Sequence, residues 1–186
     1  MTATTHSLAD LNAASAADFV DALGDVFEHA PWVAEAAAAA RPFATVAALH
    51  DALMQVVRSA PPETMLGFLR GHPELGGNVA RAGAMTDASK AEQGGLGLDR
   101  LAAEDFARFE RLNRAYRARF GFPFIICVRR HTRASIIDRF EQRLRNDPDT
   151  ELAAALDEIG HITRLRLAAL VAERETPYRP LTPLGS

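Results

Sequence analysis

Apolar residues recur at spacings of three and four positions along most of this chain, and this spacing constrains the fold more than any other feature. The clearest runs are Phe19, Leu23, Val26 and Phe27; Val46, Leu49, Leu53 and Val56; Phe106, Phe109, Tyr116 and Phe120; and Ile136, Ile137, Phe140 and Leu144. Each run forms one apolar face of an α-helix, which other helices must cover. Since 186 residues with 48% hydrophobic content suffice for one core, we expect an all-α fold: a single compact domain of about seven to nine helices over residues 1–175.

Residues that begin or end helices divide the chain in the same way. Ser15 with Asp18 resembles a capping box before the first run. Pro31 suits the first turn of the alanine-rich helix that follows, to about Ala40. Pro73 lies just beyond a short helix that it cannot continue.

Two segments do not follow the helical spacing. Residues Phe122–Val128 are rich in β-forming side chains, but one short strand has no partner, so we expect a buried extended stretch that leads into a helix. The proline-rich tail, residues 176–186, is expected to lie on the surface or to be disordered. The sequence contains no repeat of 20–50 residues and no inter-domain linker.

Composition excludes several classes of function. The formal net charge of −3 gives no basic surface of the kind that nucleic-acid binding needs. Lys90 is the only lysine, which leaves Schiff-base chemistry a single candidate. Cys127 is the only cysteine, so no internal disulfide can form, and within its apolar run we expect a small buried side chain. The six histidines have no zinc or iron spacing, so no metal site is predicted.

Targeting signals are equally weak. Residues 1–11 contain no cationic start and no apolar core of a signal peptide, and the apolar stretches are far shorter than the roughly 20 residues that cross a bilayer. The chain ends Leu184-Gly185-Ser186, which is not a peroxisomal signal. We expect a cytoplasmic protein that binds neither membranes nor nucleic acid.

His72 lies in the first of three local features that core packing does not explain. The residue before a proline is held to extended dihedral angles, so His72 should have a defined conformation in the loop that contains Pro73. A titratable imidazole placed in this way suits proton transfer. The alternative is a turn that ends a helix and leaves the imidazole exposed, and the dipeptide alone favours this alternative.

The second feature is a set of polar residues with helical spacing. If Thr86 caps a helix, then Ser89, Glu92 and Gln93 share one face with the apolar Leu96. A hydroxyl, a carboxylate and an amide on one face suggest a polar patch that contacts a ligand. Ordinary capping by Thr86 or Ser89, completed by Glu92, would explain the same residues.

The third feature is an arginine within an apolar face. In the last predicted helix, from about Asp149 to Glu173, Arg166 lies about 20° from Ile159 and thus in the middle of the apolar stripe, whereas Arg164 points to the opposite side. A buried guanidinium must find anions or several acceptors. Arg166 could therefore pair with an internal carboxylate such as Glu92, or bind a substrate carboxylate or imide.

Two further motifs give weaker signals. Gly94–Gly97 is rich in glycine but has neither the lysine nor the preceding strand of a phosphate-binding loop, so we expect the end of a helix. Phe27–Trp32 contains a carboxylate, an imidazole and an indole. We interpret it mainly as a helix corner packed by Trp32. The less favoured interpretation is that it lines the pocket.

Taken together and in order, the motifs resemble those of the 2-oxo-4-hydroxy-4-carboxy-5-ureidoimidazoline (OHCU) decarboxylases. The matching segments are Phe27 to Trp32, with Ala30 in place of serine; His72 to Leu75; Ser89, Glu92 and Gln93; Leu112 to Tyr116; Phe120 to Ile125; and Leu165 to Leu167. Each motif is short, but the ordered set is specific and spans roughly residues 7–173. The alanine in place of serine affects no residue with a catalytic role in the family.

The resemblance also implies roles for individual residues. His72 corresponds to the catalytic acid/base, and Glu92 to its carboxylate partner at the substrate. Pro73 would shape the pocket wall. The positions that would hold the ureido and imidazoline edges of the substrate, by side chain or backbone, are Ser89, Gln93, Phe122, Phe124, Ile125, Ile126 and Arg166.

The activity that the resemblance implies is decarboxylation of OHCU to (S)-allantoin and CO2 in urate breakdown, with a proton added to one face of C5. It further implies that no cofactor takes part and that the chain forms a homodimer. Two alternatives stay open. One is a different small helical enzyme that acts on a ureide or purine-derived ring with the same His72 and Glu92, and the other is a binding module in which Arg166 only clamps Glu92.

Overall fold

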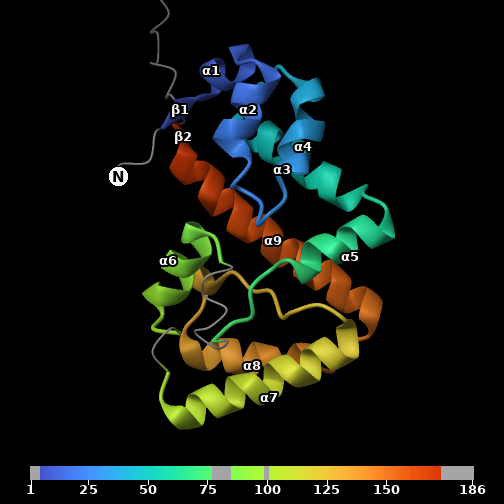
Figure 1. Ribbon diagram of the computed structural model, residues 1–186, viewed down its shortest axis with the longest axis vertical. Coiled ribbons are helices and arrows are strands. Elements are labelled where there is room, and N and C mark those ends of the chain that lie inside the picture. The colour runs from blue at the N-terminus through green and yellow to red at the C-terminus, as the bar shows by residue number, and fades with distance from the viewer. Residues whose placement is uncertain (1–4, 77–84, 99–100, 173–186) are drawn as a thin grey trace, which may run out of the picture.

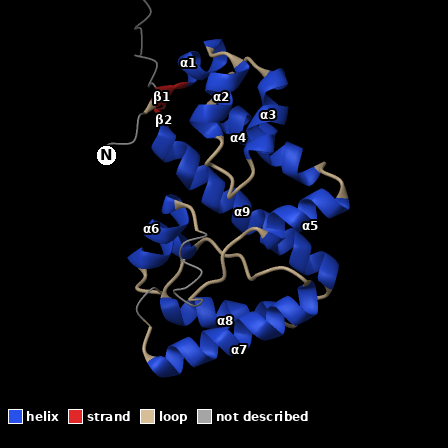
Figure 2. Ribbon diagram, viewed as in Figure 1, coloured by secondary structure: helices blue, strands red, loops and turns tan. Residues whose placement is uncertain are grey.

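The computed structural model describes residues 5–76, 85–98 and 101–172 (Figure 1). Regular structure in these ranges is almost entirely helical, as Figure 2 shows. The strands there are β1 (His6–Ser7) and β2 (Val171–Ala172), which pair in parallel with His6 opposite Val171. The all-α prediction is confirmed, and the short strand pair is an addition that the pattern does not predict. The predicted tail, residues 176–186, lies outside the described ranges.

The helices follow the predicted order. In the described ranges the α-helices are α1 (Leu8–Ala13), α2 (Ala16–Leu23), α3 (Pro31–Ala37), α4 (Val46–Arg58), α5 (Pro62–Arg70), α6 (Asp87–Gly95), α7 (Ala103–Phe120), α8 (Arg133–Arg143) and α9 (Pro148–Leu170). Short 3-10 helices, η1 (Ala38–Ala40) and η3 (Val128–Arg130), follow α3 and the extended segment. Apolar spacing does not predict α1, because Leu11 is its one buried residue.

The first predicted helix ends earlier than its apolar run. α2 stops at Leu23, whereas Val26 and Phe27 lie in the turn beyond it, still buried. In this turn Val26 N donates to Leu23 O and Ala30 N to Phe27 O, three residues back instead of four. The spacing of apolar residues indicates which side chains are buried, and side chains in a buried turn can have the same spacing as those in a helix.

Side-chain caps and one glycine fix where the helices near the site begin and end. Thr45 caps α4, Thr86 caps α6, and Asp147 caps α9, each by accepting backbone N–H groups of the first turn. One such cap contributes about 1 kcal/mol. α7 ends at Gly121, whose φ of 77° is left-handed and therefore favours glycine.

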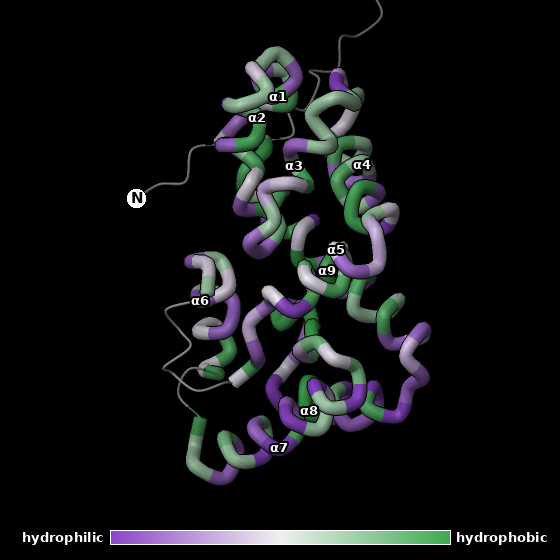
Figure 3. The backbone as a smooth tube through the Cα atoms, turned by 45° about the vertical axis from the view of Figure 1, so that its right-hand side comes forward, coloured by the Kyte–Doolittle hydropathy of each residue, from purple (hydrophilic) through white to green (hydrophobic). Residues whose placement is uncertain are grey.

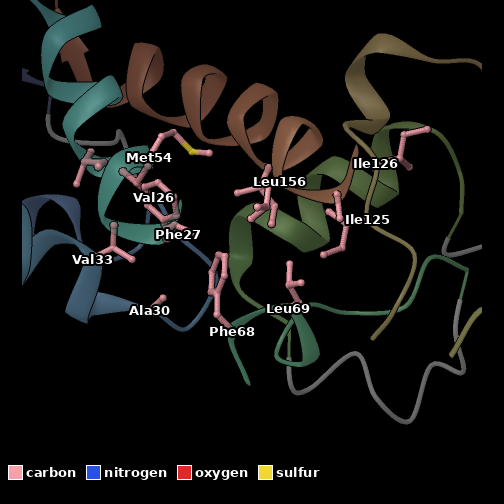
Figure 4. Close-up of a cluster of buried hydrophobic side chains, with 14 of the residues drawn as sticks. Val26, Phe27, Ala30, Val33, Met54, Phe68, Leu69, Ile125, Ile126 and Leu156 are labelled. Atoms are coloured by element: carbon pink, nitrogen blue, oxygen red, sulfur yellow. The ribbon is translucent and has the colours of Figure 1, made fainter. Parts of the chain in front are cut away.

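α9 is the longest described helix and passes most of the others (Figure 1). α4 packs on α9, α2 and α4 pack on α3, and α7 packs on α8. In the core, Val26 and Phe27 lie on one side of Leu156, and Ile125 and Ile126 on the other (Figure 4). α9 therefore connects the helices of the N-terminal half with the segment that precedes α8.

The solvent-facing side of α7 is polar. Hydrophilic and hydrophobic positions alternate along α7 (Figure 3), where Phe109 and Tyr116 are buried and Arg108 and Arg119 are exposed. Within residues 5–76, 85–98 and 101–172, no helix combines the length and the apolar character needed to cross a membrane.

Residues Phe122–Val128 form the buried extended stretch that the sequence predicts. All seven are buried, and none of them belongs to a strand. The stretch leads directly into η3, and Gly121 at its start receives a hydrogen bond from Arg70 Nε to its carbonyl oxygen at 3.0 Å. A chain segment that runs through the core without a strand partner must have its backbone groups satisfied in other ways.

Candidate active site

One cavity brings the three sequence features together. It has an empty volume of about 390 Å³, including its open mouth, and lies between the loop after α5, α6, the extended segment and α9. The residues that line it are His72, Pro73, Leu75, Ser89, Glu92, Gln93, Phe124, Ile125, Ile126, Val128, Ile162 and Arg166. Of the residues predicted for the site, Phe122 does not line this cavity, because its ring packs on the rings of Tyr116 and Phe120.

His72 lies in the turn after α5, and its imidazole is half-buried. Its Nδ1 is 3.1 Å from the carbonyl oxygen of Phe68, and its ring meets the Phe68 ring edge-on at 4.8 Å. A carbonyl only accepts hydrogen bonds, so Nδ1 carries the proton and Nε2 keeps a lone pair. Burial lowers the pKa of His72 to about 4. At neutral pH His72 is therefore an uncharged base.

Arg166 is surrounded by acceptors from the protein itself. Its Nε donates to Glu92 Oε1 at 3.0 Å and its Nη2 to Glu92 Oε2 at 2.9 Å. Nη2 also donates to Ser89 Oγ at 3.0 Å, and Nη1 donates to Glu28 Oε2 at 3.0 Å and to Val26 O at 3.5 Å. A guanidinium has five N–H groups, so each of them has an acceptor. The longest of these contacts is the one to Val26.

Glu28 belongs to the segment Phe27–Trp32, which the sequence predicts mainly as a packing corner and only secondarily as part of the pocket. It is 2% exposed and accepts hydrogen bonds from Thr86 N at 3.1 Å, Thr86 Oγ1 at 2.8 Å and Ser89 Oγ at 2.7 Å, besides that from Arg166. Burial raises the pKa of Glu28, but the hydrogen bonds from Ser89 and Thr86 outweigh it, so the net pKa is lowered and the group is ionised.

The corner that carries Glu28 has an uncommon backbone. His29 adopts a left-handed φ of 51°, which is rare for a residue other than glycine and is found at functional sites. Trp32 packs edge-on against Phe68 at 6.2 Å, as a packing corner predicts. Ala30, where the family has serine, is buried in the core. The Glu28 carboxylate, next to an otherwise apolar packing corner, is the sequence feature that could have assigned this segment to the active site.

α6 contributes both a cap and a polar face. Thr86 Oγ1 accepts from Ser89 N at 3.3 Å, so the ordinary capping interpretation holds for Thr86. Gln93 accepts from Gly76 N at 3.2 Å and donates to Glu74 O at 3.4 Å, and it thereby fixes the loop that follows His72. The amide of Gln93 both lines the cavity and supports its wall.

The charges around the cavity sum to one negative charge. Glu28 and Glu92 supply two carboxylates, Arg166 one cation, and His72 is neutral. Most of the other residues that line the cavity are apolar. Such a site can exchange a proton through His72 Nε2 in surroundings with little water. The described residues contain no group of three metal-binding side chains.

The comparisons with known proteins agree on one family. The family model described as OHCU decarboxylase matches residues 12–168. A protein of Haloferax volcanii named 2-oxo-4-hydroxy-4-carboxy-5-ureidoimidazoline decarboxylase is 45% identical over 150 residues, which cover 81% of this chain and 87% of that protein. A protein of the same name from Halalkalicoccus jeotgali is 38% identical over 172 residues, or 92% of this chain and 96% of that protein.

A solved structure of an (S)-allantoin synthase has the same fold. It superposes with a TM-score of 0.69 at 27% sequence identity over 89% of this chain. The present chain spans about half of that protein, 54% of its length.

Proposed function

Since the chain belongs to the OHCU decarboxylase family, we propose that it converts OHCU to (S)-allantoin and CO2 in urate breakdown, without a cofactor. The observation that carries the proposal is the cavity in which His72 offers a free Nε2 beside Ser89, Glu92 and Gln93. These are the positions at which the family resemblance expects the acid/base and the substrate-binding groups.

The substrate supplies its own electron sink. OHCU carries a hydroxyl and a carboxylate on C4, next to a C5=N imine. When CO2 leaves, the bonding electrons flow into the imine, C4 becomes doubly bonded to C5, and the former imine nitrogen takes up a proton from solvent. Loss of the hydroxyl proton and addition of a proton at C5 then give allantoin. The protein has to orient the carboxylate out of the ring plane, accept the hydroxyl proton, and direct the proton that is added at C5 to one face.

His72 suits the proton transfer. Its Nε2 is unprotonated at neutral pH and accepts the proton of the C4 hydroxyl as this oxygen becomes a carbonyl. The imidazolium that forms is then an acid within the cavity. Glu92, held by two hydrogen bonds from Arg166, accepts hydrogen bonds from substrate N–H or O–H groups. Ser89 and Gln93 line the same side of the cavity.

Arg166 acts mainly by fixing Glu92 and Glu28. A ligand reaches its guanidinium by replacing the 3.5 Å contact of Nη1 with Val26 O, because the other four N–H groups have acceptors within 3.0 Å. The leaving carboxylate then lies against apolar side chains of the cavity lining. There a localised charge is poorly solvated, which favours the loss of CO2.

The deciding experiment is chiral detection of allantoin from freshly generated OHCU. The proposal expects (S)-allantoin in large excess and a rate that increases with protein concentration. Racemic allantoin at the spontaneous rate would contradict it. An enzyme for another ureide or purine-derived ring would leave the OHCU rate unchanged, and a binding module would bind (S)-allantoin without turnover.

The proposal also includes a homodimer in the cytoplasm, and both parts rest on the family resemblance. The assembly is measured by sedimentation velocity, in which the expected mass is twice that of one chain. A single species with the mass of one chain across the concentration range would contradict the dimer and leave the proposed reaction untouched.

A further inference from the structure

The cavity wall formed by Phe124–Ile126 has a buried ionic network on its far side. At its centre, Glu151 is 0% exposed. Its Oε1 accepts from Arg143 Nε at 2.8 Å, from Arg143 Nη2 at 2.6 Å and from the Tyr116 hydroxyl, and its Oε2 accepts from Asn146 Nδ2 at 2.7 Å. Helices α7, α8 and α9 each contribute to this network.

Arg143 connects the network to the wall. Its third nitrogen, Nη1, donates to the carbonyl oxygen of Ile125 at 2.8 Å, and its guanidinium carbon lies 4.6 Å from the centre of the Phe124 ring. Further along the segment, Cys127 N donates to Glu158 Oε2 of α9 at 2.8 Å. Side chains of α8 and α9 therefore satisfy backbone groups that a neighbouring strand would satisfy in a sheet.

The bonds to α8 and α9 are made by alternate residues, Ile125 and Cys127. In an extended chain the backbone groups of successive residues point to opposite sides, so those of Phe124 and Ile126 face the other way. Both residues line the cavity, and within the described part of the chain their N–H groups have no hydrogen-bond partner. Buried backbone N–H groups without a partner are rare, and two of them beside a cavity are donors available to a ligand.

We propose that Arg143 and Glu151 are positioning residues for the ligand-binding wall. Arg143 holds the Ile125 carbonyl away from the cavity, and this fixes the direction of the Phe124 and Ile126 N–H groups, which then donate to carbonyl oxygens of the ureido or imidazoline group. Glu151 holds Arg143 in that orientation. The inference rests on the proposed function for the identity of the ligand, but the geometry of the wall is independent of it.

The test replaces the ion pair as a unit. Arg143→Met alone strands the buried Glu151 carboxylate and is expected to unfold the chain, whereas the double variant R143M/E151Q leaves neutral side chains of similar length. In this double variant we expect KM for OHCU and Kd for (S)-allantoin to rise about tenfold, as for the loss of one or two hydrogen bonds to a ligand, with less than about a threefold change in kcat. Arg139→Met, the same change in an exposed position of α8, is the matched control.

A second variant keeps the inference testable if the double variant does not fold. Arg143→Lys retains the charge beside Glu151 but cannot reach Glu151 and the Ile125 carbonyl with the same fork of donors. It should weaken (S)-allantoin binding in the same direction and shift the amide resonances of Phe124 and Ile126, while R139M does neither. Folded R143K or R143M/E151Q protein that binds (S)-allantoin within about twofold of the unaltered chain would overturn the inference.

The two proposals fail in different ways. If the unaltered chain neither turns over OHCU nor binds (S)-allantoin, the proposed function is wrong, and the amide shifts in R143K still report whether Arg143 orients the wall. If the unaltered chain is active and the variants match it in KM and Kd, the function stands and the positioning role is wrong.

Discussion

At the scale of single side chains, His72 is the group whose removal should affect the reaction most. His72→Asn is expected to lower the rate about 10²–10⁴-fold, the usual contribution of a general acid or base. The melting temperature should change little, because His72 lies in a turn outside the apolar helix faces. Rates with OHCU and a thermal melt of the same preparation measure both effects. Full stereospecific activity of the variant would contradict the assigned role.

The lowered pKa of His72 also predicts a dependence on pH. The neutral imidazole is the base, so kcat/KM should increase as pH rises through about 4 and then stay level through neutral pH. Between pH 4 and the ordinary value of 6.5, the unfolded chain binds a proton that the folded chain does not, and the free energy of unfolding therefore falls as pH decreases through this window. His72→Asn should make that decrease shallower in urea titrations. Equal slopes in both proteins would show that His72 titrates normally.

Arg166 and Glu92 test whether the buried charges support the fold, the reaction or both. Arg166→Met should cost about 3–5 kcal/mol, because it strands two carboxylates while keeping the apolar stem of the side chain. Adding Glu92→Gln should recover most of that loss, since Glu28 keeps its hydrogen bonds from Thr86 and Ser89. Activity should not return in the double variant. Denaturant unfolding and OHCU turnover measure the two quantities, and recovered turnover would make Arg166 and Glu92 purely structural.

At the scale of one element, the cap of α6 has a second task that the cap of α4 does not share. Thr86→Val and Thr45→Val should each cost about 1 kcal/mol in unfolding free energy, the typical value of an N-cap. Only Thr86 also donates to Glu28, so only Thr86→Val should weaken (S)-allantoin binding, as titration calorimetry measures. Equal affinities of the two variants for (S)-allantoin would show that Thr86 serves only as a helix cap.

The elements also show what local pattern can and cannot predict. Helical spacing identified the buried face of α9 and placed Arg166 within it, because both follow from residues three and four positions apart. Glu28 was harder to assign, since its partner Arg166 lies 138 positions away and no local spacing reports such a contact. The strand pair His6–Ser7 with Val171–Ala172 went unpredicted for the same reason, as two residues carry no periodicity.

At the scale of the whole molecule, the reaction should need nothing beyond the chain and its substrate. In the reaction that we propose, the imine of the substrate takes up the electrons that the departing CO2 leaves behind, so no metal or organic cofactor is required as an electron sink. Exhaustive chelation should therefore leave OHCU turnover unchanged, and added pyridoxal phosphate or thiamine diphosphate should not increase it. A stoichiometric metal whose removal abolishes turnover would refute this expectation.

The long separation between Glu28 and Arg166 has a consequence for the newly made chain. Glu28 leaves the ribosome early, whereas its cation Arg166 follows 138 positions later. Until α9 docks, Glu28 and Glu92 lack the guanidinium that pairs with both of them, which makes burial of the two carboxylates costly. Because Ile162 and Arg166 of α9 line the cavity, its lining is not complete until that helix has docked. We expect turnover to begin only after α9 has docked, so a chain in which this helix is not yet packed should be inactive.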